Sequence, residues 1–323
     1  MIKIKNVTKK VKDLIILKNI NLEINNGKIL GIIGESGAGK STLLRTINGL
    51  SEVSSGEILI DNNPIKTLDN KSLRKARQNI GMVFQNFNLL KQKTVYENIM
   101  LSLSICKYNK KDSNKRILEL LSLTNLSDKK DAYPKTLSGG EKQRVSIARA
   151  LASNPKYLLC DEITSALDKK TSIEIMNLLL EINKEYKVTI IFVSHDLFSI
   201  KYISDEIVVM KEGEIIEKNS TVDFFLQPKT NFSKKLVNNN VLISSSNLNK
   251  ETIYRITYKE KTSSHPLIAY VTKNYDVIIN ILFGEIISLK DESIGQLFVN
   301  ISGSDKNKAI SYLKQKVQVN IYE

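Results

Sequence analysis

Residues 34–41 read Gly-Glu-Ser-Gly-Ala-Gly-Lys-Ser (GESGAGKS), which fits the phosphate-binding pattern G-x-x-x-x-G-K-[ST]. The apolar run before it, KILGII (Lys28–Ile33), predicts a buried strand, and the run after it, STLLRTINGL (Ser41–Leu50), has helical spacing of its leucines. A strand, a glycine-rich loop and a helix in this order direct backbone N–H groups at a phosphate. Lys40 would add a full positive charge at the outer phosphates, and Ser41 a hydroxyl for Mg²⁺. The alternative, a glycine-rich turn with a surface lysine, leaves the flanking strand and helix unexplained.

The size and composition are those of an ordinary globular protein. The 323 residues are enough for two domains, with 41% hydrophobic and 25% charged residues. No apolar run approaches the ~18 residues of a membrane span, and the first ten residues have no apolar signal core. We therefore expect a cytoplasmic protein whose link to a membrane comes through a partner. The two cysteines, Cys106 and Cys160, predict reduced thiols rather than a disulfide framework.

The net charge of +14 raises the question of nucleic-acid binding. The excess of lysine and arginine lies almost entirely in the first 250 residues, where it is scattered and not interleaved with aromatic residues, and tryptophan is absent. We therefore expect no nucleic-acid partner. A lysine-rich surface close to anionic lipid headgroups is enough to account for the charge.

Strand and helix patterns alternate around the phosphate-binding loop. Strand patterns fill residues 2–30, helical patterns fill residues 94–153, and buried strands return at Lys156–Cys160 and Val188–Val193 with a helix, Thr171–Glu185, between them. This alternation predicts an α/β fold with a parallel sheet. A hairpin is expected at residues 207–217.

The last part of the chain changes character. Residues 229–250 are rich in Asn, Ser and Lys and predict a linker, with a short helix around Phe232–Val237. Residues 251–323 read strand, helix, three strands, helix, strand, which predicts a ferredoxin-like α+β domain with one extra hairpin strand, Glu285–Leu289. The predicted domains are therefore 1–228, a linker 229–250, and 251–323. His265 in the second domain has no motif context and is interpreted as a surface residue.

Four more motifs follow the phosphate-binding loop in order: LSGGEKQR (Leu137–Arg144), YLLCDE (Tyr157–Glu162), SALD (Ser165–Asp168) and Ser194-His195-Asp196. Asp161 ends an apolar strand, where its carboxylate can reach Mg²⁺, directly or through water. Glu162 would polarise the water that attacks the γ-phosphate, as general base. The alternatives are a solvated acidic pair and a structural histidine. We instead expect His195 to contact the γ-phosphate and to orient Glu162 or the water.

These motifs, with Gln85 between the first two, resemble the ATP-binding-cassette (ABC) ATPases over residues 1–228. The resemblance implies ATP and Mg²⁺ as ligands, Lys40, Glu162 and His195 as catalytic residues, and Ser41, Gln85 and Asp161 at the metal. It also implies a head-to-tail homodimer in which Ser138, Gly139 and Gly140 bind the nucleotide of the opposite subunit and Asp168 works across the interface. The nucleotide contacts are expected at Gly34, Glu35, Ser36, Gly37, Ala38, Gly39, Lys40, Ser41, Thr42, Gln85, Ser138, Gly139, Gly140 and Asp168. One departure is Val11, which stands where such proteins usually stack an aromatic residue on adenine, so base selectivity is expected to be loose.

The stretches IGMVFQNFNLL (Ile80–Leu90), TVYENI (Thr94–Ile99) and 133–168 resemble the ATPase subunit of bacterial methionine importers. Asn280-Ile281-Leu282 spells the NIL signature of that family's C-terminal regulatory domain, where bound methionine inhibits transport. The resemblance implies two membrane-spanning permease subunits, an extracellular binding lipoprotein, a place on the cytoplasmic face of the membrane, and methionine contacts at Asn280 and Gly295. An importer for another amino acid or small peptide, an exporter ATPase, a ribosome- or DNA-directed cassette protein and an amino-acid sensor with a vestigial ATPase are the alternatives. A single phosphate-binding loop, the NIL segment and the intact catalytic residues disfavour the last three.

Overall fold

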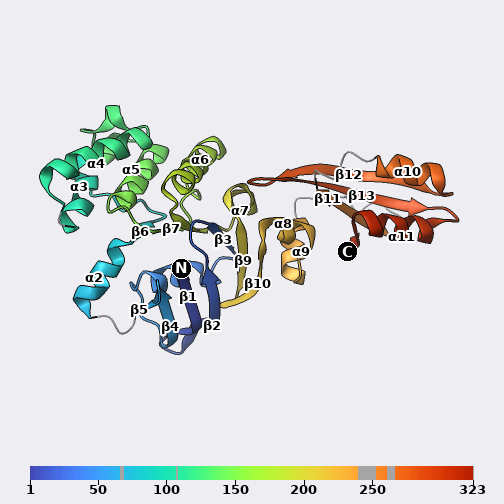
Figure 1. Cartoon of the computed structure of the whole chain (residues 1–323), viewed down its shortest axis with the longest axis horizontal. Helices are drawn as coiled ribbons and strands as arrows, with labels where there is room; N and C mark the ends of the chain where they lie inside the picture. Colours follow the sequence, from blue (N-terminus) through green and yellow to red (C-terminus); the bar gives the residue numbers. More distant parts are fainter. Residues whose placement is uncertain (66–68, 107, 239–251, 260–265, 323) are drawn as a thin grey trace. The chain divides into compact units, whose positions relative to one another are not determined.

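The structure is a computed structural model that describes residues 1–65, 69–106, 108–238, 252–259 and 266–322. The chain forms two compact units, Met1–Lys218 and Asn219–Glu323, each with its own sheet and core (Figure 1). Helix α9 (Asn231–Asn238) lies inside the segment that the sequence predicts as a linker. Residues 239–250 of that segment, and His265, lie outside the described residues.

A six-stranded sheet in the order β10-β9-β3-β8-β7-β6 is the frame of the first unit. Its strands are β3 (Ile29–Ile33), β6 (Ile80–Val83), β7 (Tyr157–Asp161), β8 (Thr189–Val193), β9 (Glu206–Lys211) and β10 (Glu214–Ser220). The pairs β6–β7, β7–β8, β8–β3 and β3–β9 are parallel. Every residue of β3, β7 and β8 is buried, which is why these strands are continuous apolar runs in the sequence. The expected hairpin is confirmed: β9 and β10 are joined by Glu212-Gly213, both at positive φ.

A second, antiparallel sheet in the order β2-β1-β4-β5 packs against the first through a shared hydrophobic core. Its strands are β1 (Ile2–Val11), β2 (Leu14–Ile24), β4 (Ser55–Ile60) and β5 (Asn63–Pro64). Ile2 and Leu17 from this sheet, Ile32 and Val193 from the parallel sheet, and Leu43 from α1 (Lys40–Ile47) are all fully buried in that core. The core therefore fixes the helix that begins at the phosphate-binding loop.

Helices occupy the region where the sequence predicts them. They are α2 (Asn70–Gln78), α3 (Val95–Ile105), α4 (Lys110–Leu123), α5 (Gly139–Leu151), α6 (Lys169–Tyr186) and α7 (Leu197–Ile203), with short 3-10 turns at Ser127–Lys129 and Pro134–Thr136. Several begin at a side chain that caps the first turn: Thr94 and Ser138 each form a capping box with a glutamate three residues later, and Asp168 caps α6. Each helix start is therefore set locally by its own sequence.

The second unit has a four-stranded antiparallel sheet in the order β12-β13-β11-β14. Its elements are α8 (Thr221–Leu226), α9, β11 (Ile253–Lys259), α10 (Leu267–Asn274), β12 (Ile278–Ser288), β13 (Ser293–Ser302), α11 (Lys306–Lys316) and β14 (Gln318–Tyr322). Side chains of α10 and α11 join Ile256, Val299 and Val319 of the sheet in one core, so both helices cover the same face. From β11 on, this is the ferredoxin-like order that the sequence predicts.

The prediction of an extra hairpin strand at 285–289 is wrong. Residues 278–288 form one long strand, β12, which pairs with β13 along its whole length. A register irregularity between Ile281 and Phe283 absorbs one residue, so the ladder continues past Gly284 instead of ending there.

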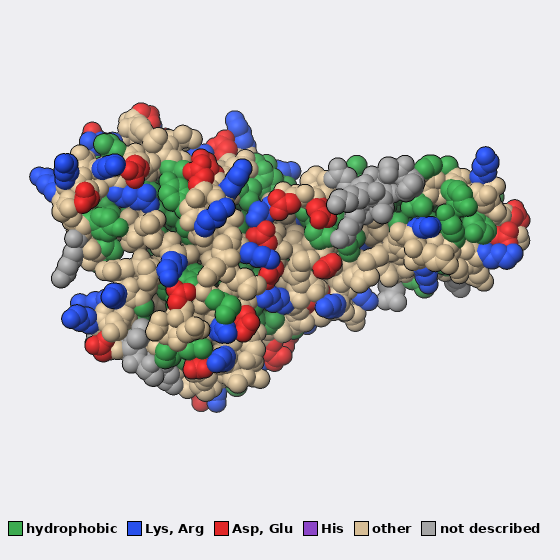
Figure 2. All heavy atoms as spheres, in the orientation of Figure 1, with side chains coloured by type: hydrophobic (Ala, Val, Ile, Leu, Met, Phe, Trp, Pro, Cys, Tyr) green, Lys and Arg blue, Asp and Glu red, His purple; other side chains and the backbone are tan. Residues whose placement is uncertain are grey.

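Within the described residues, no helix combines the length and the apolar composition that a membrane span requires. Lys and Arg side chains lie among acidic ones over the face shown in Figure 2. On that face the positive charge is spread out and does not form one stripe.

Candidate nucleotide site

The phosphate-binding loop connects β3 to α1, as the sequence predicts. Lys40 is only 4% exposed, and its Nζ donates to the carbonyl oxygens of Gly34 (2.8 Å) and Glu35 (2.9 Å), which curls the side chain back into the loop. Gly39 has φ 95°, and a Cβ there would lie 2.9 Å from the carbonyl oxygen of Ile16, so only glycine fits. No side chain caps α1, which leaves the first-turn N–H groups for a bound phosphate.

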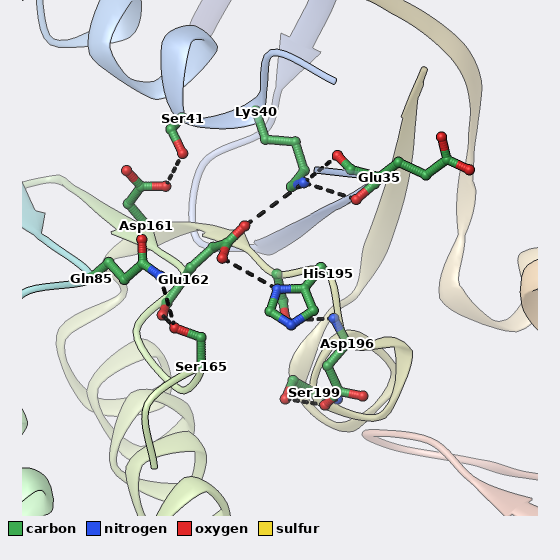
Figure 3. A network of polar contacts seen from close by, with 12 residues as sticks. Glu35, Lys40, Ser41, Gln85, Asp161, Glu162, Ser165, His195, Asp196 and Ser199 are labelled. Atoms are coloured by element: carbon green, nitrogen blue, oxygen red, sulfur yellow. Dashed lines mark hydrogen bonds and ion pairs between the residues drawn. The ribbon is translucent and has the colours of Figure 1, made fainter. Parts of the chain in front are cut away.

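The acidic pair lies at the carboxyl end of β7, facing the loop (Figure 3). Asp161 Oδ1 accepts a hydrogen bond from Ser41 Oγ at 2.6 Å. Glu162 Oε1 lies 3.8 Å from Lys40 Nζ. Glu162 itself has φ 49°, an uncommon conformation for a residue with a side chain, of the kind that proteins retain at functional sites.

His195 follows β8 and completes the arrangement. Its Nδ1 lies 3.2 Å from Glu162 Oε2, so the Glu162 carboxylate is held between Lys40 and His195 (Figure 3). The His195 side chain is 57% exposed and that of Glu162 only 19%, so the histidine lies on the open side of the carboxylate. The structure thus brings together the three residues that the sequence predicts as catalytic.

Burial controls the ionisation of the site. Burial lowers the pKa of Lys40, and the nearby carboxylates of Glu162 and Asp161 oppose this shift. Burial raises the pKa of Asp161, against the hydrogen bond from Ser41 and the positive charges of Arg45 and Lys40. Both groups therefore favour a ligand that brings compensating charge: phosphate for the lysine and a divalent cation for the aspartate.

Ser165 is a site residue that the sequence argument missed. Gln85 Nε2 donates to Ser165 Oγ at 3.2 Å, and Ser165 Oγ donates to the backbone carbonyl of Glu162 at 2.8 Å. Ser165 thereby connects Gln85 to the backbone of the acidic pair (Figure 3). The available signal was its place as the first residue of SALD, three positions after Glu162.

Ser138 and Asp168 lie at helix starts away from this network. The Ser138 hydroxyl accepts from the N–H of Glu141, and Glu141 Oε2 accepts from the N–H of Ser138 at 2.7 Å. Asp168 accepts from the N–H and the hydroxyl of Thr171. Within the described part of the chain, none of the hydrogen bonds or ion pairs around Lys40 and Glu162 reaches Ser138 or Asp168. A single chain therefore does not bring them into contact with this network.

Two family models match the chain, "ABC transporter" over residues 17–165 and "NIL domain" over residues 252–321. Methionine import ATP-binding protein MetN 1 of Bacillus thuringiensis subsp. konkukian is 43% identical over 311 residues, covering 94% of this chain and 92% of that protein. MetN of Clostridioides difficile is 43% identical over 316 residues, covering 98% and 97%. The chain belongs to the family of methionine import ATP-binding proteins. It is an ABC-type ATPase.

Solved ABC structures share the fold of the first unit. A bacterial ABC transporter cassette solved as a dimer is 42% identical, with a TM-score of 0.64, over 68% of this chain and 99% of that one. The same cassette in a post-hydrolysis state bound to ADP and phosphate has a TM-score of 0.63. CbiO1 of Clostridium perfringens, part of an ABC transporter complex, is 35% identical with a TM-score of 0.66 over 74% of this chain. The P-loop ABC ATPase fold is thereby confirmed.

The donor atoms of this ABC ATPase fit a magnesium nucleotide. A hydroxyl (Ser41), a carboxylate (Asp161) and an amide oxygen (Gln85) are the oxygen ligands that Mg²⁺ prefers. In the described residues, no three His, Cys, Asp or Glu side chains gather into a metal site of their own.

Val11 is the last residue of β1. It is 52% exposed and pairs across the hairpin with Leu14, another exposed aliphatic residue. Two residues further along β2, the Ile16 carbonyl lies against Gly39. This ABC ATPase therefore has exposed aliphatic side chains, Val11 and Leu14, at the end of the β1–β2 hairpin. The sequence likewise places valine, and not an aromatic residue, at the position expected to stack on adenine.

The structure does not bring Asn280 and Gly295 together within one NIL domain. Asn280 is exposed and pairs with Asn300, whereas Gly295 is buried and pairs with Ile286. Five residues of β13 separate Gly295 from Asn300, which is about 16 Å. A Cβ at Gly295 would lie 2.2 Å from the ring of Tyr258, so the close approach of this ring accounts for the glycine.

Proposed function

We propose that this chain is the ATP-hydrolysing subunit of a methionine importer. The proposal depends mainly on one arrangement: Lys40 and His195 both contact the Glu162 carboxylate, and the hydrogen-bonded Ser41–Asp161 pair lies next to it. The relatives named as methionine import proteins support the substrate. The binding of ATP and the hydrolysis of its phosphoanhydride bond would drive uptake.

Each residue of the network has a distinct role in the proposed mechanism. Lys40 and the N–H groups of α1 bind and orient the β- and γ-phosphates, for which Lys40 exchanges its carbonyl partners. Glu162 accepts a proton from the attacking water, and His195 holds the Glu162 carboxylate through Nδ1 and turns its other nitrogen toward the γ-phosphate. Ser41, Asp161 and Gln85 would hold Mg²⁺.

Replacing Glu162 with Gln is the direct test. The amide cannot accept the proton, so the steady-state ATPase rate should fall by about 100-fold or more, while ATP still binds. Glu181→Gln, an exposed residue on α6, is the matched control and should hydrolyse ATP like the unchanged protein. Normal turnover by the Glu162 variant would remove Glu162 as general base.

We infer that the active form is a head-to-tail homodimer. Ser138, Gly139 and Gly140 begin α5 and present a second helix N-terminus to an anion. A site made from the loop of one chain and Ser138 of another explains why one chain keeps them unconnected. The dimeric cassette among the solved structures supports this assembly.

We propose that a groove in the first unit receives the permease. The groove has a volume of about 1450 Å³ and lies among α2, β6, α3 and α5. Arg74, Lys75 and Arg149 make its lining basic, and Leu101 and Ile105 add exposed aliphatic surface. An amphipathic segment with acidic and aliphatic side chains would complement this lining. Two permease subunits, an extracellular binding lipoprotein and a place on the cytoplasmic face of the membrane complete the proposed importer.

We also propose that methionine inside the cell binds the NIL domain and inhibits the ATPase, with Asn280 as the contact that the sequence predicts. By linkage, methionine inhibits only if it binds better to the state in which the two ATPase units are apart. The ATPase rate of the assembled transporter, measured with and without L-methionine, tests this directly. A rate that does not change would reject the regulation and leave the ATPase assignment intact.

A further inference from the structure

The segment that follows Gln85 has an unusual backbone conformation. Phe87 has φ 59° and Asn88 φ 49°, in the left-handed region that residues with a side chain rarely adopt, and a bulky aromatic residue least of all. The N–H of Asn88 donates to the carbonyl oxygen of Asn86, which closes a three-residue turn around Phe87. With a positive φ at its centre, this is the rare and strained form of such a turn. We call Asn86–Asn88 the strained turn.

Helix α5 holds the strained turn through three side-chain hydrogen bonds. Arg149 Nη2 donates to the carbonyl oxygen of Phe87 at 2.8 Å, and Nη1 donates to that of Asn88 at 2.6 Å. The hydroxyl of Ser146, which is fully buried, donates to the same Phe87 carbonyl at 3.2 Å. Because the guanidinium is planar and its donors are fixed in a fork, two successive carbonyls bonded to it cannot rotate independently. Strained backbone persists only where the surroundings hold it in this way.

Among the described residues, Arg149 has no carboxylate partner. The side chain is half-buried, and burial lowers its pKa. Its side-chain hydrogen bonds go to two backbone carbonyls, those of Phe87 and Asn88 in the strained turn. Buried charges in proteins are normally paired with an opposite charge. An arginine that instead bonds the backbone of a strained turn indicates that the conformation of this turn matters for function.

The strained turn begins directly after Gln85, whose side chain reaches the nucleotide site. Gln85 Nε2 donates to Ser165 Oγ at 3.2 Å, and Ser165 Oγ donates to the Glu162 carbonyl (Figure 3). Strand β6 ends at Val83, so Gln85 lies in a short link between the sheet and the turn. If the turn relaxed to negative φ, the chain would change direction here and carry the Gln85 amide away from the acidic pair. The conformation of the turn therefore controls where Gln85 points.

We propose that Arg149 and Ser146 are positioning residues for ATP hydrolysis, because they hold the strained turn and thereby keep the Gln85 amide within reach of Mg²⁺. In the described residues, their side chains bond the turn and none of the catalytic residues, so they act through Gln85. The proposal rests on the proposed function in one respect, that Gln85 is a ligand of Mg²⁺.

Substitutions in the full chain can separate this role from the charge that Arg149 gives to the groove. Arg149→Lys keeps the positive charge, but a single ammonium cannot bond two carbonyls in the geometry of the fork. Asn88→Gly added to Arg149→Lys is the rescue variant, since glycine adopts a positive φ without steric cost and the turn then needs less support. Asn154, an exposed residue just after α5 with φ 53°, provides the matched control. Asn154→Gly added to Arg149→Lys makes the same exchange outside the turn.

The ATPase rate of the full chain, measured against free Mg²⁺ at saturating ATP, tests the role of the turn. Arg149→Lys should lower kcat roughly tenfold and raise the Mg²⁺ concentration for half-maximal rate severalfold, while KM for ATP changes little. Ser146→Ala removes one of the three hydrogen bonds, so its effect should have the same direction and be smaller. Asn88→Gly should restore part of both losses, and Asn154→Gly should restore neither.

Hydrogen exchange followed by mass spectrometry gives a readout that does not depend on activity. Without nucleotide or metal, the peptide that contains the strained turn should exchange faster in Arg149→Lys than in the unchanged chain, because the hydrogen bond of the Asn88 N–H opens more often. Adding Asn88→Gly should slow this exchange again. Thermal melting checks that each variant is folded.

Other outcomes would separate the inference from the proposed function. Unchanged kcat and Mg²⁺ dependence in a folded Arg149→Lys chain would overturn the inference. A loss that Asn88→Gly restores no better than Asn154→Gly would also overturn it, because Arg149 would then have a general structural role. Both results leave Glu162 as general base and the ATPase assignment intact. If Gln85→Ala itself shows the Mg²⁺ dependence of the unchanged chain, Gln85 is not a metal ligand, and its proposed metal role fails together with the inference.

Discussion

At the scale of single residues, the site is held by a few hydrogen bonds that join segments far apart in the sequence. Ser41 and Asp161 are separated by 120 positions, and Glu162 and His195 by 33. Each motif by itself predicts which kind of chemistry its side chains can perform. The distances between side chains of different motifs are set only when β3, β8 and β7 lie side by side in the sheet.

Asp61 provides a prediction about pH and stability. Burial acts to raise its pKa, but hydrogen bonds from the N-terminal ammonium, the Tyr157 hydroxyl (2.6 Å) and Lys156 hold that pKa well below its usual range. A carboxyl whose pKa is lower in the folded state stabilises the fold above its unfolded pKa, about 3.9, and this contribution is lost as pH falls through the folded pKa. Asp61→Asn should therefore lower the free energy of unfolding of the first unit by about 1–3 kcal/mol at pH 7.

Urea unfolding followed by circular dichroism at pH 7 and at successively lower pH would measure this effect. The difference between Asp61→Asn and the unchanged chain should shrink as the medium becomes more acidic. Asp13→Asn, an exposed turn residue, is the control. A difference independent of pH would show that the carboxylate charge is not what stabilises this corner.

Gly295 provides a prediction that separates packing from ligand binding. A Cβ there would overlap the Tyr258 ring, so Gly295→Ala should destabilise the NIL domain by about 1–3 kcal/mol. Adding Tyr258→Ser should remove most of that penalty, which a double-mutant cycle of unfolding free energies would measure. An unchanged stability together with lost methionine binding would favour a ligand contact instead.

At the scale of elements, two helices that follow a motif, α5 and α6, start at a residue with a second, structural role. Ser138 caps α5 and Asp168 caps α6 through hydrogen bonds that need no nucleotide. A substitution at either position therefore changes both helix stability and function, and the two effects need separate controls.

Ser138→Ala and Glu141→Ala remove the two halves of the same capping box. Each should destabilise the helix by a similar amount, about 0.5–2 kcal/mol. If Ser138 also binds the nucleotide of the opposite subunit, Ser138→Ala should lower the ATPase rate of the assembled transporter much further than Glu141→Ala does. Equal ATPase rates in the two variants would leave Ser138 with its capping role alone.

At the scale of the whole molecule, the catalytic residues Lys40, Glu162 and His195 lie on other elements of the first unit than those that line the groove. ATP hydrolysis and coupling to a partner can therefore be disturbed separately. The groove is lined by α2, α3 and α5, while the catalytic residues follow β3, β7 and β8. Substitutions in the groove should therefore change transport without changing the chemistry.

Charge reversal in the groove tests this separation. Arg74→Glu with Lys75→Glu should weaken the binding of an acidic permease segment, because like charges repel. Methionine uptake by the assembled transporter should therefore fall severalfold or more. The basal ATPase rate of the chain alone should not change. Lys110→Glu with Lys111→Glu, at the start of α4 outside the groove, is the control. Normal uptake by the groove variant would place the permease elsewhere.

Local patterns in the sequence were enough to predict most helices and strands and the types of the catalytic residues. The phosphate-binding loop, the buried strands β7 and β8 and the capped helices all depend on neighbours within a few positions, so a single chain segment contains the information. The same holds for the order of elements in the NIL domain. The extra strand was predicted wrongly because Gly284 looks like a break, whereas pairing with β13 carries β12 through it.

Only the tertiary structure decided what depends on contacts between distant segments. The link from Gln85 through Ser165 to Glu162 and the separation of Asn280 from Gly295 both arise from register and packing. A residue's type and spacing predict which face of a strand it occupies. Whether its polar atoms find a partner depends on the strands and helices packed against that face, which lie elsewhere in the chain.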